Sequence, residues 1–308
     1  MTKLNAGRVA IVTGAGAGIG RSHALALAAS GAQVVVNDVA TAKDEHGRVP
    51  AEAVAAAINE AGGTAIANGD DVSSDAGAQA LIEAAVGAFG GLHALVNNAG
   101  ILRDKMLVNM SEAEWDAVIA VHLKGTFGPA RHAARYWREQ SKSGAAPDAR
   151  IINTTSASGV FGNVGQSNYG AAKAGIAAFS IITAMELARY GITVNAVAPR
   201  ALTAMTETLP RYQAMAAEPG GADRIGPDHI SPVVVWLASP LSAEVTGRVI
   251  GIFGTTISVY EGWHNGPTVT RDDGQWSAEE LDGVLPGLVK QARPNADMTG
   301  EAKPAQEG

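Results

Sequence analysis

Residues 9–31, VAIVTGAGAGIGRSHALALAASG, decide how the rest of the chain is expected to fold. A short apolar run leads into three spaced glycines, and a helical pattern of apolar residues follows. Strand, glycine turn and helix in this order place backbone N–H groups and a helix amino terminus where they can bind phosphate. A glycine pattern alone is weak evidence, because such turns also occur without a ligand. The residues expected to line the phosphate site are Gly14, Gly18, Ile19 and Gly20.

An acidic residue follows the second apolar run of the chain. Residues 33–36 are apolar or extended in pattern, and Asp38 stands 18 residues after Gly20. An acid in this place can accept hydrogen bonds from the hydroxyls of an adenosine ribose and can repel a 2′-phosphate. No Arg or Lys follows Asp38 before Lys43, so the sequence favours NAD over NADP. The alternative is that Asp38 only caps a helix.

Strand-like runs alternate with helical patterns over most of the chain. This alternation predicts an α/β fold with a doubly wound parallel sheet of about seven strands and helices on both faces. The expected strands are residues 9–13, 33–36, 64–67, 92–96, 150–155, 192–197 and 249–253. The main expected helices are 50–61, 74–89, 111–138 with a Ser111–Glu114 capping box, 166–190, 231–238 and 277–291. Ligands bind at the carboxyl ends of strands in such sheets, between the first and fourth strands. Further candidate cofactor contacts at these ends are Asp71, Val72, Asn98, Ala99, Gly100 and Pro199.

Tyr169 and Lys173 stand four residues apart in the expected helix 166–190. Residues with this spacing lie on one face of a helix. A Tyr ordinarily loses its proton near pH 10, and a fixed ammonium beside it is expected to lower its pKa. Tyr169 is therefore a candidate acid and base, and Ser156 could hydrogen-bond the oxygen that gains or loses the proton. The alternative is an exposed pair without a role.

The composition excludes several classes of protein. The chain has 308 residues with 23 basic and 30 acidic side chains, a net charge of −7, which argues against nucleic acid or an anionic membrane surface as the main partner. It has no cysteine, so disulfides and thiolate chemistry are excluded, and its seven His form no metal-binding pattern. No run approaches about 18 apolar residues, so we expect no membrane span, no signal peptide and a cytoplasmic location.

One domain is expected over residues 1–292. Residues 200–229 lack periodicity and contain several Pro and Gly, and a loop of this length is usually functional. We expect a substrate lid there, with a short helix at 204–216. An extra carboxyl-terminal segment is expected at 255–292, and residues 293–308 are expected to be a disordered tail.

Four motifs in combination make the chain resemble a short-chain dehydrogenase/reductase over about residues 5–255. The motifs are TGAGAGIG at 13–20, NNAG at 97–100, Ser156, and YGAAK at 169–173. Longer stretches resemble the (3R)-hydroxyacyl-CoA dehydrogenase portion of peroxisomal multifunctional enzyme type 2 and its bacterial relatives. These stretches are NDVA, GGTAIANGDDV, LRDKM, VHLKGTF and SASGVFGNVGQSNYGAAKAG. The resemblance implies a Rossmann-like fold.

The resemblance also implies an NAD-dependent oxidoreductase that interconverts a secondary alcohol and a ketone by hydride transfer. The implied substrate is a 3-hydroxyacyl-CoA or a hydroxysteroid-like molecule. Tyr169 would be the acid and base, Lys173 would bind the nicotinamide ribose and lower the pKa of Tyr169, and Ser156 would position the substrate oxygen. Thr203 would contact the carboxamide of the cofactor. A homodimer or homotetramer is implied, formed through long helices with apolar faces around Val118 and Phe179.

Two residues depart from the pattern of the family. His122, in VHLKG, stands where many members have an Asn that supports a proton relay. It is expected either to carry protons itself or to be a buried hydrogen-bonding residue. Arg200 follows Pro199 where many members have Gly. The alternatives to the implied function are a general NADPH-dependent ketone or quinone reductase and a cofactor-binding scaffold without turnover.

Overall fold

A computed structural model describes residues 3–203, 206–207, 209–272 and 274–302. The chain divides into two compact units after Tyr260, and each is described by itself. The predicted extent of one domain to residue 292 stays a prediction.

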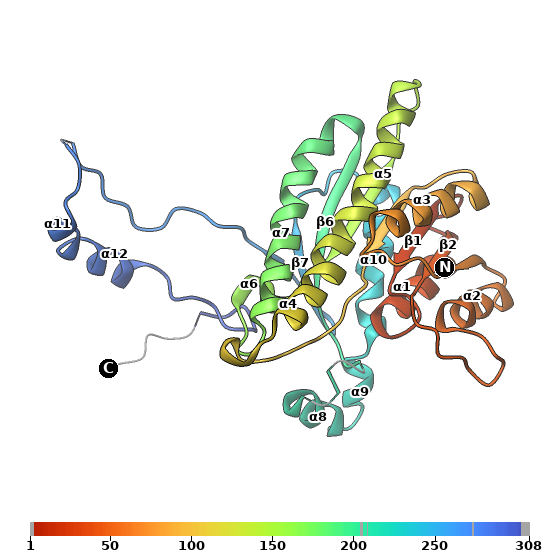
Figure 1. The fold of residues 1–308 in the computed structure, drawn as a ribbon, viewed down its shortest axis with the longest axis horizontal. Helices are drawn as coiled ribbons and strands as arrows, with labels where there is room; N and C mark the ends of the chain where they lie inside the picture. The colour runs from red at the N-terminus through yellow and green to blue at the C-terminus, as the bar shows by residue number, and fades with distance from the viewer. Residues whose placement is uncertain (1–2, 204–205, 208, 273, 303–308) are drawn as a thin grey trace. The chain divides into compact units, whose positions relative to one another are not determined.

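The first unit is built on an eight-stranded sheet with the order β3-β2-β1-β4-β5-β6-β7-β8 (Figure 1). The strands are β1 (Val9–Thr13), β2 (Gln33–Asn37), β3 (Thr64–Asn68), β4 (Ala94–Asn97), β5 (Ala149–Thr154), β6 (Ile192–Arg200), β7 (Val249–Phe253) and β8 (Thr256–Tyr260). The first seven pair in parallel, which confirms the doubly wound α/β fold. The order in which the strands are added reverses at β1, which has β2 on one side and β4 on the other. The sequence predicted the ligand site here, between the first and fourth strands.

The sequence analysis missed β8, which pairs antiparallel to β7. The connection holds only two residues, and Gly254 there has a φ of +53° that suits glycine. Ile257 and Val259 are 62% and 58% exposed, so β8 lacks the buried pattern by which the other strands were recognised. A solvent-facing strand carries no run of core residues to mark it.

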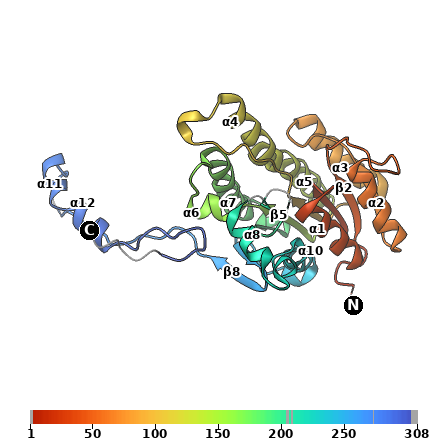
Figure 2. The ribbon, with the colours of Figure 1, turned by 90° about the horizontal axis from the view of Figure 1, so that it is seen from below.

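Helices cover both faces of the sheet. They are α1 (Gly18–Ala29), α2 (Pro50–Glu60), α3 (Asp75–Phe89), α4 (Glu112–Ile119), α5 (Gly125–Lys142), α6 (Ala157–Phe161), α7 (Ser167–Leu187), α8 (Pro210–Ala217), α9 (Gly221–Arg224) and α10 (Ser231–Ala238). Alternate side chains of a strand face opposite sides of a sheet. Ala10 and Val12 of β1 accordingly share a hydrophobic cluster with α1, α2 and α10, and Val9 and Ile11 share another with α3, α5 and α7. Figure 2 shows these two helical layers on either side of the strands.

The long helix predicted from Ser111 is interrupted. Ser111 and Glu114 form the expected capping box at its start. A π-helical turn, Ala120–Lys124, then separates α4 from α5, which continues to Lys142, beyond the predicted end at Arg138. Turns of this kind are frequent at functional sites, and this one carries His122.

Two predicted helices differ from the structure. The helix expected at 204–216 begins only at Pro210, a residue suited to the first turn of a helix, while residues 204, 205 and 208 lie outside the described residues. In the second unit, α11 (Ala278–Asp282) and α12 (Leu285–Gln291) replace the single helix expected at 277–291. Pro286 cannot donate a backbone hydrogen bond, and its ring clashes with the preceding turn, so one continuous helix is excluded.

The end of the chain tests the predicted tail only in part. Ala296 and Ala302 pair in an isolated bridge, and Asp297 N–H donates to the Glu301 carbonyl at 2.9 Å. Residues 303–308 lie outside the described residues. Disorder of the tail therefore stays a prediction.

Two buried arginines share one carboxylate at the amino ends of the strands. Arg8 Nη1 lies 2.5 Å from Asp148 Oδ2, and Arg150 pairs with the other oxygen of Asp148. The Arg8 and Arg150 side chains are 7% and 1% exposed, whereas Asp148 is 46% exposed. Burial by itself would raise the pKa of Asp148, but attraction to the two guanidinium groups outweighs burial and lowers it. The shared carboxylate therefore ties the start of β1 to the start of β5.

We expect Asp148→Asn to lower the free energy of unfolding by about 2 kcal/mol. Removing one partner of a fully buried ion pair costs roughly 3–5 kcal/mol, and the partial exposure of Asp148 reduces the loss. Chemical denaturation at pH 7 measures it. Glu218→Gln is the matched control, because Glu218 pairs with Arg224 on the surface and its loss should cost under about 1 kcal/mol. Equal losses in the two variants would contradict the structural role of the buried cluster.

Candidate active site

Glycine is required where the loop after β1 meets the turn after β4. A Cβ atom on Gly14 would lie 2.7 Å from Ala99 Cα, and one on Gly20 would lie 2.1 Å from the Gly14 carbonyl oxygen. Gly14 and Gly18 also have φ values of +61° and +54°, in the left-handed region that favours glycine. The Asn98 side chain donates to the Gly14 carbonyl at 3.2 Å, so the NNAG segment holds the glycine loop in place.

Asp38 faces the glycine loop from the end of β2. One carboxylate oxygen accepts a hydrogen bond from Gly16 N–H and the other from Ala40 N–H, each at 2.9 Å. Because the cap positions of α1 and α2 are Ala17 and Val49, the alternative of a helix cap is wrong. A carboxylate has about four lone-pair sites, so Asp38 can still accept hydrogen bonds from a ribose. The half-buried side chain lies where the cofactor hypothesis needs it.

The other predicted cofactor contacts lie at the same edge of the sheet. Asp71 is exposed just beyond β3 and accepts from Ser73 N–H, while Val72 is buried in the core. Pro199 is the second-last residue of strand β6. Thr203 lies beside the glycine loop. A Cβ atom added to Gly18 would be 3.8 Å from the methyl carbon of Thr203. Ile19 packs against the core cluster beneath α1.

Ser156, Tyr169 and Lys173 are brought together between β5 and α7. Ser156 follows β5 as the N-cap of α6 and hydrogen-bonds the Tyr169 side chain. Tyr169 lies in the first turn of α7 and Lys173 one turn later. Lys173 Nζ is 5.6 Å from the centre of the Tyr169 ring and donates to the Thr154 carbonyl at 2.5 Å. The structure therefore has the helix that the sequence predicted, with the Tyr169 and Lys173 side chains on the same face of it.

The pKa of Tyr169 moves in the direction opposite to the prediction. The pKa of Tyr169 is raised to about 12, mainly by burial; the hydrogen bond with Ser156 acts to lower it, and electrostatic interaction with Asp104 and Tyr212 adds to the rise. The predicted lowering of the pKa is wrong for the protein without cofactor. Loss of hydration raises the pKa of the phenol by more than the hydrogen bond with Ser156 lowers it. The phenol therefore holds its proton firmly at neutral pH.

The Lys173 ammonium is itself destabilised by burial. Its side chain is 3% exposed, and burial lowers its pKa from 10.5 to about 7. Only one of its three possible hydrogen bonds, to the Thr154 carbonyl, is found among the described residues. The residues fit a ribose, since its hydroxyls would supply the acceptors that a buried ammonium requires.

His122 is a buried hydrogen-bonding residue. Its Nε2 atom lies 3.0 Å from the N–H and 2.7 Å from the carbonyl of Ile101, and its ring meets the Tyr169 ring edge-on at 5.1 Å. A Cβ on Gly100 would lie 2.4 Å from His122 Cε1, so the ring also requires that glycine. Burial, with a contribution from the Lys173 charge, lowers the pKa of His122 to about 3. A neutral imidazole favours the hydrogen-bonding alternative over a proton carrier.

Several supporting residues were missed by the sequence analysis. Thr155 donates to the Lys173 carbonyl at 2.6 Å, and buried Asn168 donates to the Arg103 carbonyl at 3.0 Å. Asp104 and Tyr212 lie close enough for their charges to act on Tyr169. Position beside the Ser156 and Tyr169 motifs could have indicated Thr155 and Asn168. Tyr212, 3% exposed, comes from a stretch without periodicity and carries no such signal.

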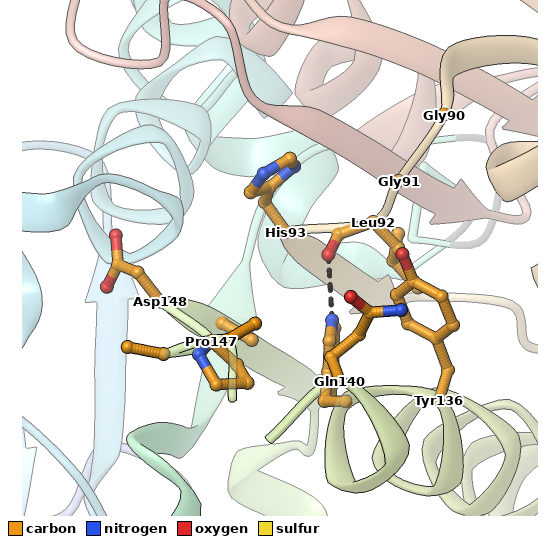
Figure 3. A pocket seen from close by; sticks show the side chains of 12 residues that line it. Gly90, Gly91, Leu92, His93, Tyr136, Gln140, Pro147 and Asp148 are labelled. Atoms are coloured by element: carbon orange, nitrogen blue, oxygen red, sulfur yellow. Dashed lines mark hydrogen bonds between the residues drawn. The ribbon is translucent and has the colours of Figure 1, made fainter. Parts of the chain in front are cut away.

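A cavity of about 340 Å³ lies at the opposite edge of the sheet, at the amino ends of β4 and β5 (Figure 3). His93, Tyr136, Gln140 and Asp148 line it. His93 accepts from Val9 N–H, and both oxygens of Asp148 are engaged by arginines. His93 and Asp148 are therefore engaged within the fold, and the cavity lies at the edge of the sheet opposite the candidate site.

Metal and membrane sites have little support. Within the part of the chain that the structure describes, no group of three or more His, Asp or Glu could hold a metal ion. Residues Ser167–Tyr190 are long and apolar enough to cross a membrane by length and composition alone. A single helix of this kind is weak evidence for a span, and α7 already packs against β5 and β6.

Comparison with known proteins gives concordant results. The profile of the family described as short chain dehydrogenase matches residues 8–214. The chain is 47% identical over 281 residues to the hydroxyacyl-CoA dehydrogenase ChsB1 of Mycobacterium tuberculosis, covering 91% of this chain and 87% of that protein. It is 39% identical to the peroxisomal multifunctional enzyme type 2 of Mus musculus, covering 78% of this chain but 31% of the mouse protein.

A solved structure is also similar. A short chain dehydrogenase from Mycobacterium avium has a TM-score of 0.85 and 49% identity to this chain. The match covers 95% of this chain and 98% of that one.

We expect Lys173→Met to remove a pH dependence of stability in the absence of cofactor. Between about pH 7 and 10.5 the unfolded chain holds a proton on Lys173 that the folded chain lacks. The free energy of unfolding of the parent protein therefore falls as the pH is lowered through this range. Urea denaturation at pH 7.5, 8.5 and 9.5 measures the slope. Lys142→Met, at an exposed lysine, should keep the parent slope. If the free energy of unfolding changed with pH by the same amount in all three proteins, burial would not lower the pKa of Lys173.

Proposed function

The chain belongs to the short-chain dehydrogenase family, and from that membership we propose that it is an NAD-dependent dehydrogenase interconverting a secondary alcohol and a ketone. The proposed substrate is a 3-hydroxyacyl-CoA or a hydroxysteroid-like molecule. The observation that carries the proposal is the meeting of Ser156, Tyr169 and Lys173 at the carboxyl end of β5. The 47% identity to a mycobacterial hydroxyacyl-CoA dehydrogenase supports the substrate class.

Tyr169 is proposed as the group that moves the proton. With its pKa raised to about 12, its phenol is protonated at neutral pH and suited to donate to a ketone oxygen during reduction. Ser156 hydrogen-bonds the same phenol, so it can hold the substrate oxygen in line with it. In the oxidative direction Tyr169 must accept a proton, which requires stabilisation of the phenolate.

Lys173 is proposed to provide that stabilisation. Its Nζ lies 5.6 Å from the Tyr169 ring, and acceptors from a bound ribose would favour its charged form over the neutral amine. Nicotinamide, when bound, supplies or accepts the hydride at the substrate carbon. Thr155 and Asn168 hold the backbone around Lys173 and Tyr169, so the two side chains keep their orientation.

The choice of NAD over NADP rests on Asp38. Its carboxylate is fixed by two backbone N–H groups beside the glycine loop. A fixed negative charge there can accept from the two ribose hydroxyls and would repel a 2′-phosphate. The alternative, an NADPH-dependent ketone or quinone reductase, would have to place a phosphate against this charge.

A homodimer or homotetramer in the cytoplasm is part of the proposal. The Val118 side chain itself is fully buried and cannot contact a partner, whereas Trp115, one turn earlier on α4, is exposed. Exposed apolar side chains also lie on the outer faces of α5 and α7, at Phe127, Ile181, Ile182 and Met185. Phe127 also meets Phe179 edge-on at 6.4 Å, which joins the two helices into one apolar surface.

The protein can be assayed with NAD and 3-hydroxyacyl-CoA esters of both configurations, from short to steroid-sized. We expect it to oxidise the esters of one configuration and not those of the other. Tyr169→Phe should lower kcat by about 10³-fold, because it removes the proton donor, while NADH binding stays within about twofold. Tyr136→Phe, at the opposite edge of the sheet, is the control and should keep full activity. Unchanged turnover in Tyr169→Phe would refute the proposed chemistry. No turnover of any ester, despite NAD binding, would move the substrate to a free alcohol or ketone.

We expect the parent protein to bind NADH at least about tenfold more tightly than NADPH, and Asp38→Ser to lose most of that preference. The substitution removes both the ribose acceptor and the repulsion of the 2′-phosphate. Fluorescence titration with the two reduced cofactors measures the ratio. Asp44→Asn changes the charge of a carboxylate that caps its own loop, and it should keep the parent ratio. Tighter binding of NADPH by the parent protein would support the reductase alternative.

A further inference from the structure

Arg200 lies just beyond the candidate catalytic residues on the neighbouring strand. Thr154 of β5 pairs with Val197 of β6, and Thr155 N–H donates to the Val197 carbonyl at 2.8 Å. Ser156 leaves β5 one residue later, while β6 continues for three more residues to Arg200. With adjacent strands about 4.8 Å apart and a rise of about 3.3 Å per residue, the Arg200 backbone lies within about 10 Å of Ser156.

The face on which the Arg200 side chain lies follows from the alternation along β6. Ala196 and Ala198 pack with Val160 of α6 in one small hydrophobic cluster. Side chains two apart share a face of a strand, so Arg200 is on the same side of the sheet as α6. Because α6 begins at Ser156, this side is also the one on which the candidate catalytic residues open.

Three aromatic rings form a chain of neighbours on that face, beginning with the ring on which Arg200 stacks. Its guanidinium carbon lies 4.5 Å from the centre of the Phe253 ring, and Phe253 is its partner in β7. The Tyr260 ring of β8 covers Gly251, where a Cβ atom would come within 2.4 Å of it. Phe161, at the end of α6, meets Tyr260 at 5.0 Å between ring centres. All four side chains are half-buried, so each keeps a part that a ligand can contact.

We propose that Arg200 determines specificity by binding a negatively charged group of the substrate, while Phe161, Phe253 and Tyr260 contact its apolar part. The inference rests on the proposed function and extends it to the region beyond the reacting carbon. A guanidinium stacked on an aromatic ring is held in one plane, and its five N–H donors allow it to bind a carboxylate or phosphate in addition to a protein group. Partial burial strengthens such a contact, since less water screens it.

The position of Arg200 at the end of β6 also links it to the cofactor side. Pro199 precedes it, and Thr203, three residues later, lies beside Gly18 of the glycine loop. The chain therefore passes from the proposed substrate contact to the proposed cofactor contact within a few residues. Burial raises the pKa of Tyr260 and attraction to Arg200 lowers it, which agrees with a cation at close range.

The negative group has two chemical sources, the phosphates of a CoA ester or a carboxylate on the carbon skeleton. Three ketones of the same chain length separate them: a 3-oxoacyl-CoA, the uncharged N-acetylcysteamine thioester, and the free 3-oxo acid. We expect Arg200→Gln to raise KM at least tenfold for the CoA ester or for the free acid, whichever carries the recognised charge. KM for the uncharged thioester, kcat and the Kd for NADH should stay within about twofold.

Arg248→Gln is the matched control. Arg248 is an exposed arginine just before β7, at the opposite edge of the sheet, so the same loss of charge should leave all three KM values unchanged. An equal rise of KM for the charged and uncharged ketones would show that Arg200 only supports the fold, and would overturn the proposal. Unchanged KM for all three ketones would overturn it as well.

Calorimetric titration of the NADH-loaded protein separates this proposal from the proposed function. Failure of the parent protein to reduce any of the ketones would count against the proposed function alone. Binding of a charged ketone by the parent and by Arg248→Gln, with at least tenfold weaker binding by Arg200→Gln, would still support the role of Arg200. Equal affinities of the two variants, or no binding of either charged ketone by the parent, would overturn it.

Discussion

The close approach of the loop after β1 to the turn after β4 is the constraint on which the site depends. Gly14 and Gly20 leave no room for a side chain, and Asn98 donates to the loop from the other side. This contact lies just beyond the paired ends of β1 and β4, where the order of the strands reverses. Asp38, Thr203 and the start of α1 are all positioned relative to that loop. A larger residue at either glycine would displace the cofactor contacts together, because they share one support.

The second feature of the site is that Lys173 and His122 are buried, and Tyr169 is partly buried, before any ligand binds. Burial raises the pKa of Tyr169 and lowers those of Lys173 and His122, so all three favour their neutral forms. A buried amine and a buried phenol are costly to ionise, and a bound ligand that supplies acceptors changes both at once. The neighbouring backbone carbonyl of Thr154 holds Lys173 in place meanwhile. In this arrangement the fold supplies the position of each group, and its protonation depends on what is bound.

The charged side chains at the two edges of the sheet differ in their surroundings. At the amino edge, Arg8 and Arg150 pair with Asp148, and His93, which lines the cavity beside them, accepts from Val9 N–H. At the carboxyl edge, the ionisable side chains Asp38, Lys173 and Arg200 lie next to the backbone turns where we propose that ligands bind. Charged groups occur at both edges, so charge alone does not mark the site. The difference is one of position, because the groups at the carboxyl edge lie beside the glycine loop and the ends of β5 and β6.

The sequence by itself determined the parallel α/β sheet, its seven parallel strands, the glycine loop, and the grouping of Ser156, Tyr169 and Lys173, because strand and helix periods and residue spacing are local properties. Several features were decided only by tertiary structure. The antiparallel β8 has exposed Ile257 and Val259 and thus no core pattern, and Pro286 divides a helix whose periodicity suggested continuity. The pKa of Tyr169 was predicted in the wrong direction, since spacing shows which groups are neighbours but not how much water they lose. The stacking of Arg200 on Phe253 joins residues far apart in the chain, and only the pairing of β6 with β7 brings them together.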